Sequence, residues 1–418
     1  MNYIFIDSRN NFEMIGIVED NRLVEFYIDK KGHSKQAGNI YRGRVVNVLP
    51  GMEAAFVDIG QGRNAYLYVK NALPKEMIST NVQVNIQDII KNGEEIIVQV
   101  LKEASENKGA KVTTHITLPG RFVVLTPFSN KINLSRKIND REEIERLNQI
   151  GEDMQKDNMG LIFRTKAFGV NEELLIDEYN MLINIFRKIE KEKKFLPCPK
   201  LIYKEMELSH QIIRDVFNHN IHKIILNDKE KYDNILSFQG IIFPKLEEKL
   251  YLDEGFNIFS QGKIVDEIKT ALARKVALKS GGYIVIDETE ALTAIDINTG
   301  KFIGSKNLED TVVKTNLEAA EEISKQIRLR DIGGIIIIDF IDMKNNKDIS
   351  LVLDKLKEFL SYDRNRANII GITKLGLVEL TRKKVRNSLN SSFIEKCPHC
   401  DGKGKILDKS IDKSLFIW

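Results

Sequence analysis

Two apolar runs that each end in an aspartate constrain the fold of this chain most. In "ALTAIDINTG" (residues 291–300), strand-forming residues lead into Asp296 and Asn298. In "GGIIIIDFID" (residues 333–342), four isoleucines lead into Asp339. The segment between them, "NLEDTVVKTNLEAAEEISKQIRLRD", contains neither Gly nor Pro and predicts one long helix. A strand, a long helix and a second strand in this order are typical of an α/β layer.

The polar residues that end these strands favour a cation site. Residues two apart in a strand share a face, so Asp296 and Asn298 point one way while the isoleucines between and before them fill the other. We expect "GGIIIIDF" to be a fully buried strand, where an unpaired carboxylate would cost several kcal/mol. Asp339 therefore requires a cation or lies at the carboxyl end of a strand, where α/β sheets keep their sites.

Together, the two aspartates would form a hard, anionic oxygen site. Mg²⁺ usually takes one or two protein carboxylates and keeps water molecules for a phosphate substrate, and Asn298 can orient a carboxylate by hydrogen bonding. This donor set indicates phosphodiester hydrolysis. The alternative is that each aspartate is a helix cap or an ion-pair partner at a strand end. We assign Asp287, Glu288 and Asp342 to that structural class, as turn or cap residues.

Composition excludes a membrane protein and indicates several domains. The chain has 418 residues, 42% of them hydrophobic and 29% charged, and no apolar run approaches the roughly 20 residues that span a bilayer. Its first residues have no signal-peptide pattern, so we expect a cytoplasmic protein. The formal net charge is only +3, so any basic surface is local. The basic segment "TRKKVRNS" (residues 381–388) fits a solvated helix face as well as an RNA groove.

Three cysteines occur in the chain. Cys397 and Cys400 enclose Pro and His with a spacing typical of metal ligands. Structural disulfides are rare in cytosolic proteins, so a metal site fits this motif better than a disulfide does. Two cysteines cannot complete a tetrahedral zinc site, which needs four ligands. His399 is interpreted as a bystander in the motif, with ligation as the lesser alternative. Cys198, between two prolines, is interpreted as an unreactive loop or core thiol.

Patterning along the chain predicts several small layers. Alternating strands near the amino terminus predict a hairpin, and the turn-rich, all-β stretch from Gly38 to about Leu118 predicts a small barrel. The run "EELLIDEYNMLINIFRKIEKEKK" predicts a helix that the following prolines stop. Beyond about Ser209 we expect a mixed α/β stretch in which "KIILND" and "YDNILSF" are strands among helices. The segment "GGYIVIDETEALTAIDIN" predicts two strands around a short turn.

Motifs spread over the whole chain resemble those of the ribonuclease E/G endoribonucleases. They are "GNIYRGRVVNVLPGMEAAFVDIG", "NKGA", "GLIFRT", "ALTAIDIN", "TNLEAAEEISKQIRLRDIGGIIIIDFIDM" and "CPHCDGKG", in this order. The resemblance implies a magnesium-dependent endoribonuclease that cleaves single-stranded RNA by attack of an activated water, leaving 3′-hydroxyl and 5′-phosphate ends. Asp296 and Asp339 match the magnesium-binding pair, and Asn298 matches the asparagine that supports them.

The resemblance also implies how RNA binds. Phe56 and Tyr66 match two aromatic RNA contacts, and Lys108 matches a basic contact; from the residues alone Phe56 fits a core position better. A pocket for a 5′-monophosphorylated end would be formed by Gly120, Val124, Arg164 and Thr165, together with Lys374. Lys374 replaces an arginine of some family members, so it offers a point charge and not a planar fork.

The resemblance implies a homodimer in which Cys397 and Cys400 of two subunits share one structural zinc ion. The chain ends soon after this motif, so we expect neither the small domain that pairs dimers in larger members nor a scaffold tail for degradation partners.

The implied fold is α/β and β multidomain. Its parts, with their expected boundaries, are an RNase H-like subdomain (1–37 and 209–278), an OB-fold RNA-binding domain of the ribosomal-protein type (38–118), a 5′-sensor subdomain (119–208), a DNase I-like catalytic subdomain (279–396), the zinc-link (397–404) and a short tail (405–418).

The expected function is therefore cleavage of single-stranded RNA, preferentially 5′-monophosphorylated, in rRNA processing and mRNA decay. The alternative is a non-catalytic RNA-binding protein of the same fold. The two aspartates favour the enzyme, since a pure RNA binder has no use for carboxylates that repel phosphates.

Overall fold

The computed structural model describes residues 1–9, 11–30, 36–73, 84–104, 108–217, 220–237, 246–300, 308–386, 388–395, 397–400 and 404. The chain divides into two compact units. The first comprises residues 1–30, 221–228 and 251–418, and the second comprises residues 31–220 and 229–250. Within the zinc-link motif residues 401–403 lie outside the described residues, as does the tail 405–418.

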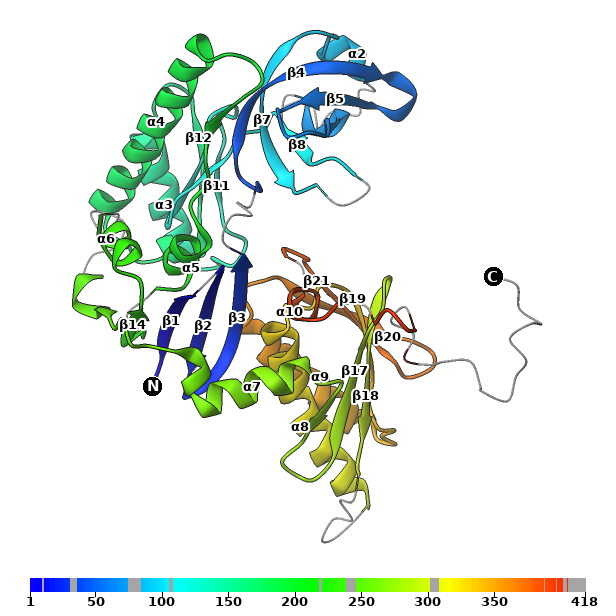
Figure 1. The fold of residues 1–418 in the computed structure, drawn as a ribbon. Helices are drawn as coiled ribbons and strands as arrows, with labels where there is room; N and C mark the ends of the chain where they lie inside the picture. The colour runs from blue at the N-terminus through cyan, green and yellow to red at the C-terminus, as the bar shows by residue number, and fades with distance from the viewer. Residues whose placement is uncertain are drawn as a thin grey trace. The chain divides into compact units, whose positions relative to one another are not determined.

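The first unit contains a five-stranded sheet in the order β15-β14-β1-β2-β3. Its strands are β1 (Tyr3–Arg9), β2 (Phe12–Glu19), β3 (Arg22–Lys30), β14 (Lys223–Leu226) and β15 (Leu250–Leu252). The first three strands are antiparallel, which confirms the predicted hairpin. Strand β14 lies parallel to β1, so segments more than 200 residues apart share this sheet (Figure 1). The short helix η5 (Ile258–Ser260) and helix α7 (Gly262–Leu272) pack against it.

The second sheet of this unit has six strands in the order β16-β17-β18-β19-β21-β20. They are β16 (Lys275–Ala277), β17 (Tyr283–Glu288), β18 (Leu292–Asn298), β19 (Gly334–Asp339), β20 (Ala367–Ile372) and β21 (Val378–Arg382). Strands β17 and β18 are antiparallel around a short turn, and β18 and β19 are parallel, as the connecting long helix requires. The predicted α/β layer is confirmed.

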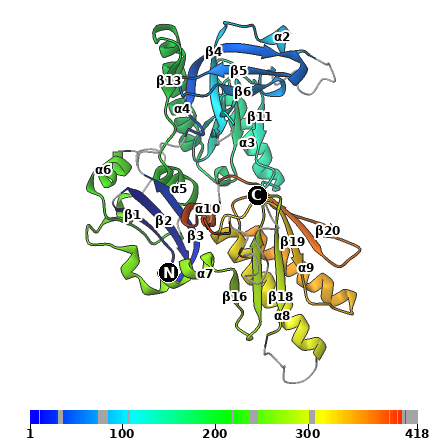
Figure 2. The ribbon, with the colours of Figure 1, turned by 45° about the vertical axis from the view of Figure 1, so that its right-hand side comes forward.

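Helices cover one face of this six-stranded sheet, on the side where Figure 2 shows α8 and α9. They are α8 (Leu308–Leu329) and α9 (Asn346–Ser361). The short helix α10 (Leu389–Phe393) packs instead against β3 and α7, in the core of the first sheet. Buried residues such as Ile295 and Ile336 of the sheet join Ile323 of α8 and Leu356 of α9 in one hydrophobic core. The Asn345 side chain accepts a hydrogen bond from the Lys347 backbone and so caps α9. Among the described residues, no helix covers the opposite face of the sheet, where Ile335 is exposed.

The second unit contains a closed five-stranded barrel. Its strands are β4 (Ile40–Leu49), β5 (Ala54–Asp58), β6 (Ala65–Tyr68), β7 (Glu95–Lys102) and β8 (Lys111–Thr113), connected with η1 (Pro50–Met52), η2 (Val69–Asn71) and α2 (Ile86–Ile89). Strand β4 pairs with both β5 and β7, which closes the ring β4-β5-β6-β8-β7. Val57, Leu67 and Val98 fill its interior. The predicted barrel is confirmed, and β13 (Lys200–Tyr203) adds to the outer edge of β4.

A four-stranded sheet and helices complete the second unit. The strands, in the order β11-β12-β10-β9, are β9 (Leu118–Pro119), β10 (Val123–Thr126), β11 (Ile132–Leu134) and β12 (Gly160–Phe163). The helices are α3 (Arg141–Met154), η3 (Thr165–Ala167), α4 (Glu172–Phe195), α5 (Leu208–Val216), α6 (Lys229–Ser237) and η4 (Glu247–Lys249). Helix α4 ends before Pro197, as predicted, because the residue before a proline takes an extended conformation.

Three local expectations are wrong. Strand β19 is not fully buried: Ile335 is 51% exposed and only alternate residues face the core, because none of the described helices covers the second face of its sheet. The segment 232–238, expected as a strand, is helical through Ser237, with a Lys229–Asp233 ion pair one helical turn apart. The basic segment 381–388 is not a helix face: it begins at the end of β21 and continues outside regular structure through Arg386.

The compact units also divide the segment 209–278, because α5 lies in the second unit with the four-stranded sheet. Among the described residues, no helix is long and apolar enough to cross a membrane.

Candidate active site

The two aspartates singled out in the sequence meet in the six-stranded sheet. Asp296 and Asp339 are register partners in the parallel pair β18–β19, at the carboxyl ends of both strands. Neighbouring strands lie about 4.8 Å apart, and register partners project to the same face. Both residues are exposed on the open face, while Ile295 and Ile338 are buried on the other. The carboxylates therefore stand side by side and accessible to solvent.

Asn298 supports one of these carboxylates directly. Its Nδ2 donates a hydrogen bond of 2.7 Å to Oδ2 of Asp296, across the two-residue spacing that places both on one face. This contact fixes the rotamer of Asp296 and leaves Oδ1 for another partner. The structure thus shows the contact between Asn298 and Asp296, and the orienting role of Asn298 stays a prediction.

The donor set of this site fits a hard divalent cation. Two carboxylates about one strand spacing apart, without sulfur or imidazole, are typical of Mg²⁺ sites that keep several water molecules. Among the described residues, no group of three or more His, Cys, Asp or Glu side chains could hold a metal. An ion here would accordingly depend on substrate and water for its remaining ligands.

Three further acidic residues lie near this site in the sequence, and two of them have structural partners. Asp287 forms an ion pair with Arg274, at 2.5 Å, and Glu288 accepts a hydrogen bond from Asn390. Asp342 is exposed in the segment that follows β19. Asp287 and Glu288 have structural partners, but both lie within strand β17 and not in the turn or helix cap that was expected.

Two aromatic rings lie side by side on the barrel. Phe56 of β5 pairs directly with Tyr66 of β6, and their ring centroids are 6.0 Å apart in an edge-to-face arrangement. Both side chains are half-buried, whereas Ala55 and Val57 beside Phe56 are buried. Phe56 therefore lies outside the barrel core, which its sequence context alone did not indicate. Lys108 is exposed in the segment before β8.

The residues of the expected 5′-phosphate pocket gather around Arg164 in the second unit. One guanidinium nitrogen of Arg164 donates to the Gly120 carbonyl at 2.6 Å, and the other pairs with Asp215 at 2.8 Å. The Thr165 hydroxyl lies 2.8 Å from the Ser135 hydroxyl, and Val124 is half-buried in β10. Four of the five residues named for this pocket thus come from adjoining segments.

Sequence reasoning missed the acids that organise this cluster. Glu178 of α4 is fully buried and accepts hydrogen bonds from the backbone of Arg121, Phe122 and Val123, directly after Gly120. Burial raises the pKa of Glu178 against these hydrogen bonds. Burial also acts to raise the pKa of Asp215, but Arg214 and Arg164 outweigh it and lower the pKa. The sequence did contain a signal for Glu178, because this carboxylate lies within the apolar stripe of the helix and therefore needs a buried partner.

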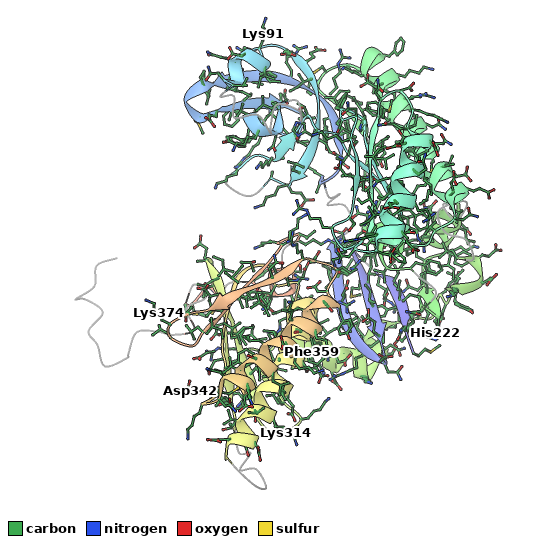
Figure 3. All side chains as sticks on the ribbon, turned by 180° about the vertical axis from the view of Figure 1, so that it is seen from behind. Lys91, His222, Lys314, Asp342, Phe359 and Lys374 are labelled. Atoms are coloured by element: carbon green, nitrogen blue, oxygen red, sulfur yellow. The ribbon has the colours of Figure 1, made fainter. Side chains whose placement is uncertain are left out.

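Lys374 lies apart from that cluster in the chain. It is exposed in the turn between β20 and β21, closed by hydrogen bonds between Thr373 and Leu377 (Figure 3). This turn belongs to the first unit, whereas the other four residues named for the pocket belong to the second.

The cysteine motif forms a tight turn. Cys397 is exposed and Cys400 half-buried, and the Gly404 backbone donates a hydrogen bond of 3.2 Å to the Cys400 sulfur. Backbone donors of His399 and Cys400 lower the pKa of the Cys397 thiol. Donors aimed at sulfur stabilise thiolates, the form that binds metals. The third cysteine, Cys198, is half-buried, and burial raises its pKa, as expected for an unreactive thiol.

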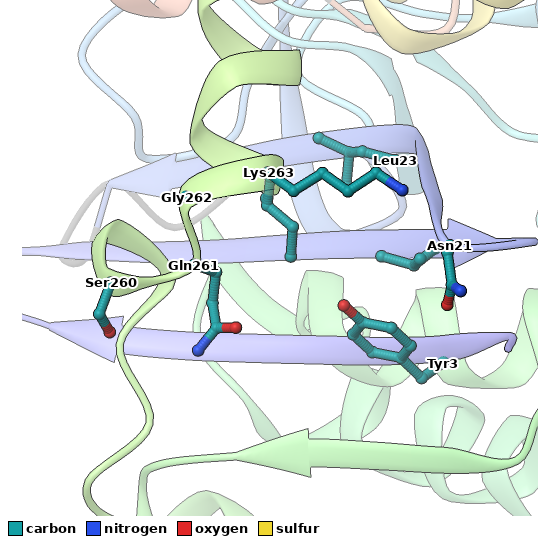
Figure 4. A pocket seen from close by; sticks show the side chains of 9 residues that line it. Tyr3, Asn21, Leu23, Ser260, Gln261, Gly262 and Lys263 are labelled. Carbon is teal, nitrogen blue, oxygen red and sulfur yellow. The ribbon is translucent and has the colours of Figure 1, made fainter.

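A separate pocket of about 300 Å³ lies between the first sheet and the start of α7 (Figure 4). Its lining includes Tyr3, Asn21, Gln261 and Lys263, but no carboxylate. It therefore lacks the ligands that a catalytic Mg²⁺ would need.

Comparisons with known proteins identify the family of this chain. A sequence model described as the ribonuclease E/G family matches residues 117–385. The chain is 40% identical to ribonuclease G of Haemophilus influenzae over 403 residues, covering 95% of this chain and 82% of that protein. It is 38% identical to ribonuclease G of Escherichia coli, covering 94% of this chain and 82% of that protein. Ribonuclease E of Haemophilus influenzae is 35% identical over the whole chain, which spans 45% of that longer protein. The chain belongs to the ribonuclease E/G family.

Proposed function

We propose that this chain is a magnesium-dependent endoribonuclease that cuts single-stranded RNA by attack of water on a phosphodiester, leaving 3′-hydroxyl and 5′-phosphate ends. That it is an endoribonuclease follows from its family and from its close relationship to ribonuclease G along most of its length. The observation that supports the mechanism best is the register pairing of Asp296 with Asp339, with Asn298 bonded to Asp296.

In this proposal Asp296 and Asp339 hold the ion. When bound, Mg²⁺ polarises a phosphoryl oxygen and lowers the pKa of a coordinated water. Asn298 would orient the Asp296 carboxylate through the hydrogen bond that its Nδ2 donates to Oδ2 of Asp296. The open face of the sheet leaves room for an RNA strand beside the two carboxylates, since Ala294 and Ile335 on that face are exposed.

We infer that the barrel binds the single strand and that the Arg164 cluster prefers a 5′-monophosphate. Bases stack on aromatic rings such as those of Phe56 and Tyr66, each worth about 1–3 kcal/mol. Lys108 would add a phosphate contact. Arg164 has donors beyond the two that Gly120 and Asp215 engage, and the Thr165 hydroxyl is a further donor. Lys374 would contribute only if it reaches the same end of the RNA.

We also propose that Cys397 and Cys400 of two copies bind one zinc ion and so form a homodimer. Backbone donors lower the pKa of the Cys397 thiol, which favours its metal-binding form, and two cysteines from each of two copies complete a tetrahedral site. Roles in rRNA processing and mRNA decay, in the cytoplasm, are the biological setting we expect.

A labelled, single-stranded 5′-monophosphorylated oligonucleotide tests the proposal. Wild-type protein should cut it with Mg²⁺ and not with EDTA. Asp339→Asn should cut about a thousandfold more slowly, because metal polarisation is worth several kcal/mol, while still binding the RNA. Equal cutting by both proteins would remove the site assignment. Binding without cutting by either protein would favour the alternative, a non-catalytic RNA-binding protein.

A further inference from the structure

One buried polar side chain outside the proposed metal site is bonded to the strand that carries Asp339. Asn316, in the middle of α8, is fully buried. Its Nδ2 donates a hydrogen bond of 2.8 Å to the Ile341 carbonyl, and its Oδ1 accepts one of 3.1 Å from the Ile341 backbone N–H. Ile341 comes two residues after Asp339, so Asn316 holds the chain where β19 ends.

The sheet itself gives Ile341 no partner in the described part of the chain. The pairing of β19 with β18 ends at Asp339, and its pairing with β21 ends at Ile338. Backbone groups beyond that point, in a half-buried segment, must find partners elsewhere. A primary amide carries a donor and an acceptor side by side, as a peptide group of a neighbouring strand does. Asn316 therefore extends the hydrogen bonding of β19 past the last strand pair.

We propose that Asn316 is a positioning residue for the RNA-cleaving site, which fixes the carboxylate of Asp339 relative to that of Asp296. This inference rests on the proposed magnesium-dependent function. Mg²⁺ demands near-ideal octahedral geometry, so ligands must be held to within about 0.5 Å. The backbone before Asp339 is held by strand pairing with β18 and β21. The backbone after Asp339 is held by the hydrogen bonds of Asn316 and by the burial of Phe340.

Asn316 and Asn298 act on different strands. Asn298 contacts the Asp296 carboxylate directly, whereas Asn316 contacts only backbone on the Asp339 side. Because α8 also packs in the core of the sheet, Asn316 links the helix that crosses over between the two strands to the site that those strands form.

The test compares Asn316→Ala and Asn316→Asp with Ser324→Ala. Ser324 is a matched control: it is buried on the same helix, but its hydroxyl donates only to the Ala320 carbonyl, within the helix. For each variant, kcat, KM and the Mg²⁺ concentration at half-maximal rate are measured with the labelled oligonucleotide, below the melting temperature of that variant. RNA binding in EDTA is measured by fluorescence anisotropy.

Both Asn316 variants should lower kcat at least tenfold and raise the half-maximal Mg²⁺ concentration severalfold, with excess Mg²⁺ restoring part of the rate. Their KM and their RNA affinity in EDTA should stay within twofold of the wild type. Asn316→Asp keeps the acceptor for the Ile341 N–H but loses the donor, so it separates loss of the donor from loss of packing. Ser324→Ala should keep the wild-type Mg²⁺ dependence.

An unchanged Mg²⁺ dependence in both Asn316 variants, or the same change in Ser324→Ala, would overturn the inference. Variants of Asn316 that do not fold would also overturn it, by showing a purely structural role. A wild-type protein that cuts equally with Mg²⁺ and with EDTA would instead refute the proposed function. The wild type is therefore assayed under both conditions before the variants are compared.

Discussion

Arg164 already has two protein partners: the Gly120 carbonyl and the Asp215 carboxylate. A guanidinium carries five N–H donors in a fixed plane, so two engaged nitrogens orient the remaining donors. This preorganisation lowers the cost of binding a phosphate, since the side chain need not be ordered on binding. Asp215, whose pKa is lowered by Arg214 and Arg164 against the effect of burial, stays ionised and keeps the fork in place.

Arg164→Gln should slow cleavage of 5′-monophosphorylated RNA by about ten- to a hundredfold, because a charged hydrogen bond is worth about 1.5–3 kcal/mol. Cleavage of the same oligonucleotide with a 5′-hydroxyl should change little. The two substrates are compared by kcat/KM. An equal loss for both substrates would show that Arg164 serves the fold of this cluster and not the recognition of the phosphate.

At the scale of elements, buried ion pairs join the two sheets of the first unit. Glu25 of β3 is almost fully buried and pairs with Arg328, at the end of α8, and with Arg364, just before β20. Arg328 also pairs with Glu19 at 2.8 Å. Burial acts to raise the pKa of Glu25, but Arg364 and Arg328 outweigh it and lower that pKa from 4.5 to about 2. Helix α8, which packs on the strands that carry Asp296 and Asp339, is thereby attached to the first sheet.

These ion pairs predict how stability depends on pH. The pKa of Glu25 is depressed in the folded state, so its contribution is complete above about pH 4.5 and is lost as the pH falls toward 2. A shift of this size corresponds to about 3 kcal/mol. Glu25→Gln should lower the free energy of unfolding at pH 7 by about this amount, because Arg328 and Arg364 lose the charge of an almost fully buried carboxylate.

Urea unfolding of wild type and Glu25→Gln at pH 7, 4.5 and 3 checks this. The difference between the two proteins should narrow as the pH falls below 4.5. A difference that stays constant across these pH values would show that the variant loses packing and not an ion pair.

At the scale of the whole molecule, the proposed zinc site needs a second copy of the chain. Removing zinc with a chelator, or changing Cys397→Ser and Cys400→Ser, should convert a dimer to monomers, because the two cysteines of one copy supply only two of the four ligands that a tetrahedral zinc site needs. Native mass spectrometry measures both the mass and the zinc content. Cys198→Ser is the matched control and should remain a zinc-containing dimer, since that thiol is half-buried elsewhere and its pKa is raised by burial. A dimer that persists without zinc would refute the shared site.

Local patterns explain which elements the sequence could predict. The absence of Gly and Pro in α8, the prolines after α4 and the alternation in β17 and β18 act over a few residues, so they can be interpreted without knowing the fold. The wrong prediction for β19 has a tertiary cause. The four isoleucines of β19 suggested burial on both faces, but whether a second helix layer covers a strand is decided elsewhere in the chain.

The sequence by itself determined the barrel, the α/β layer, the family and the residue types of the proposed metal site, because these depend on short-range periodicity and on motifs. Only the tertiary structure decided that Asp296 and Asp339 are register partners on an open face, that Asp215 engages Arg164, and that Asn316 holds the end of β19. Each of these contacts joins residues about 25 to 50 positions apart in the chain. Strand register and burial are set by the packing of the whole sheet, so no local preference could have specified them.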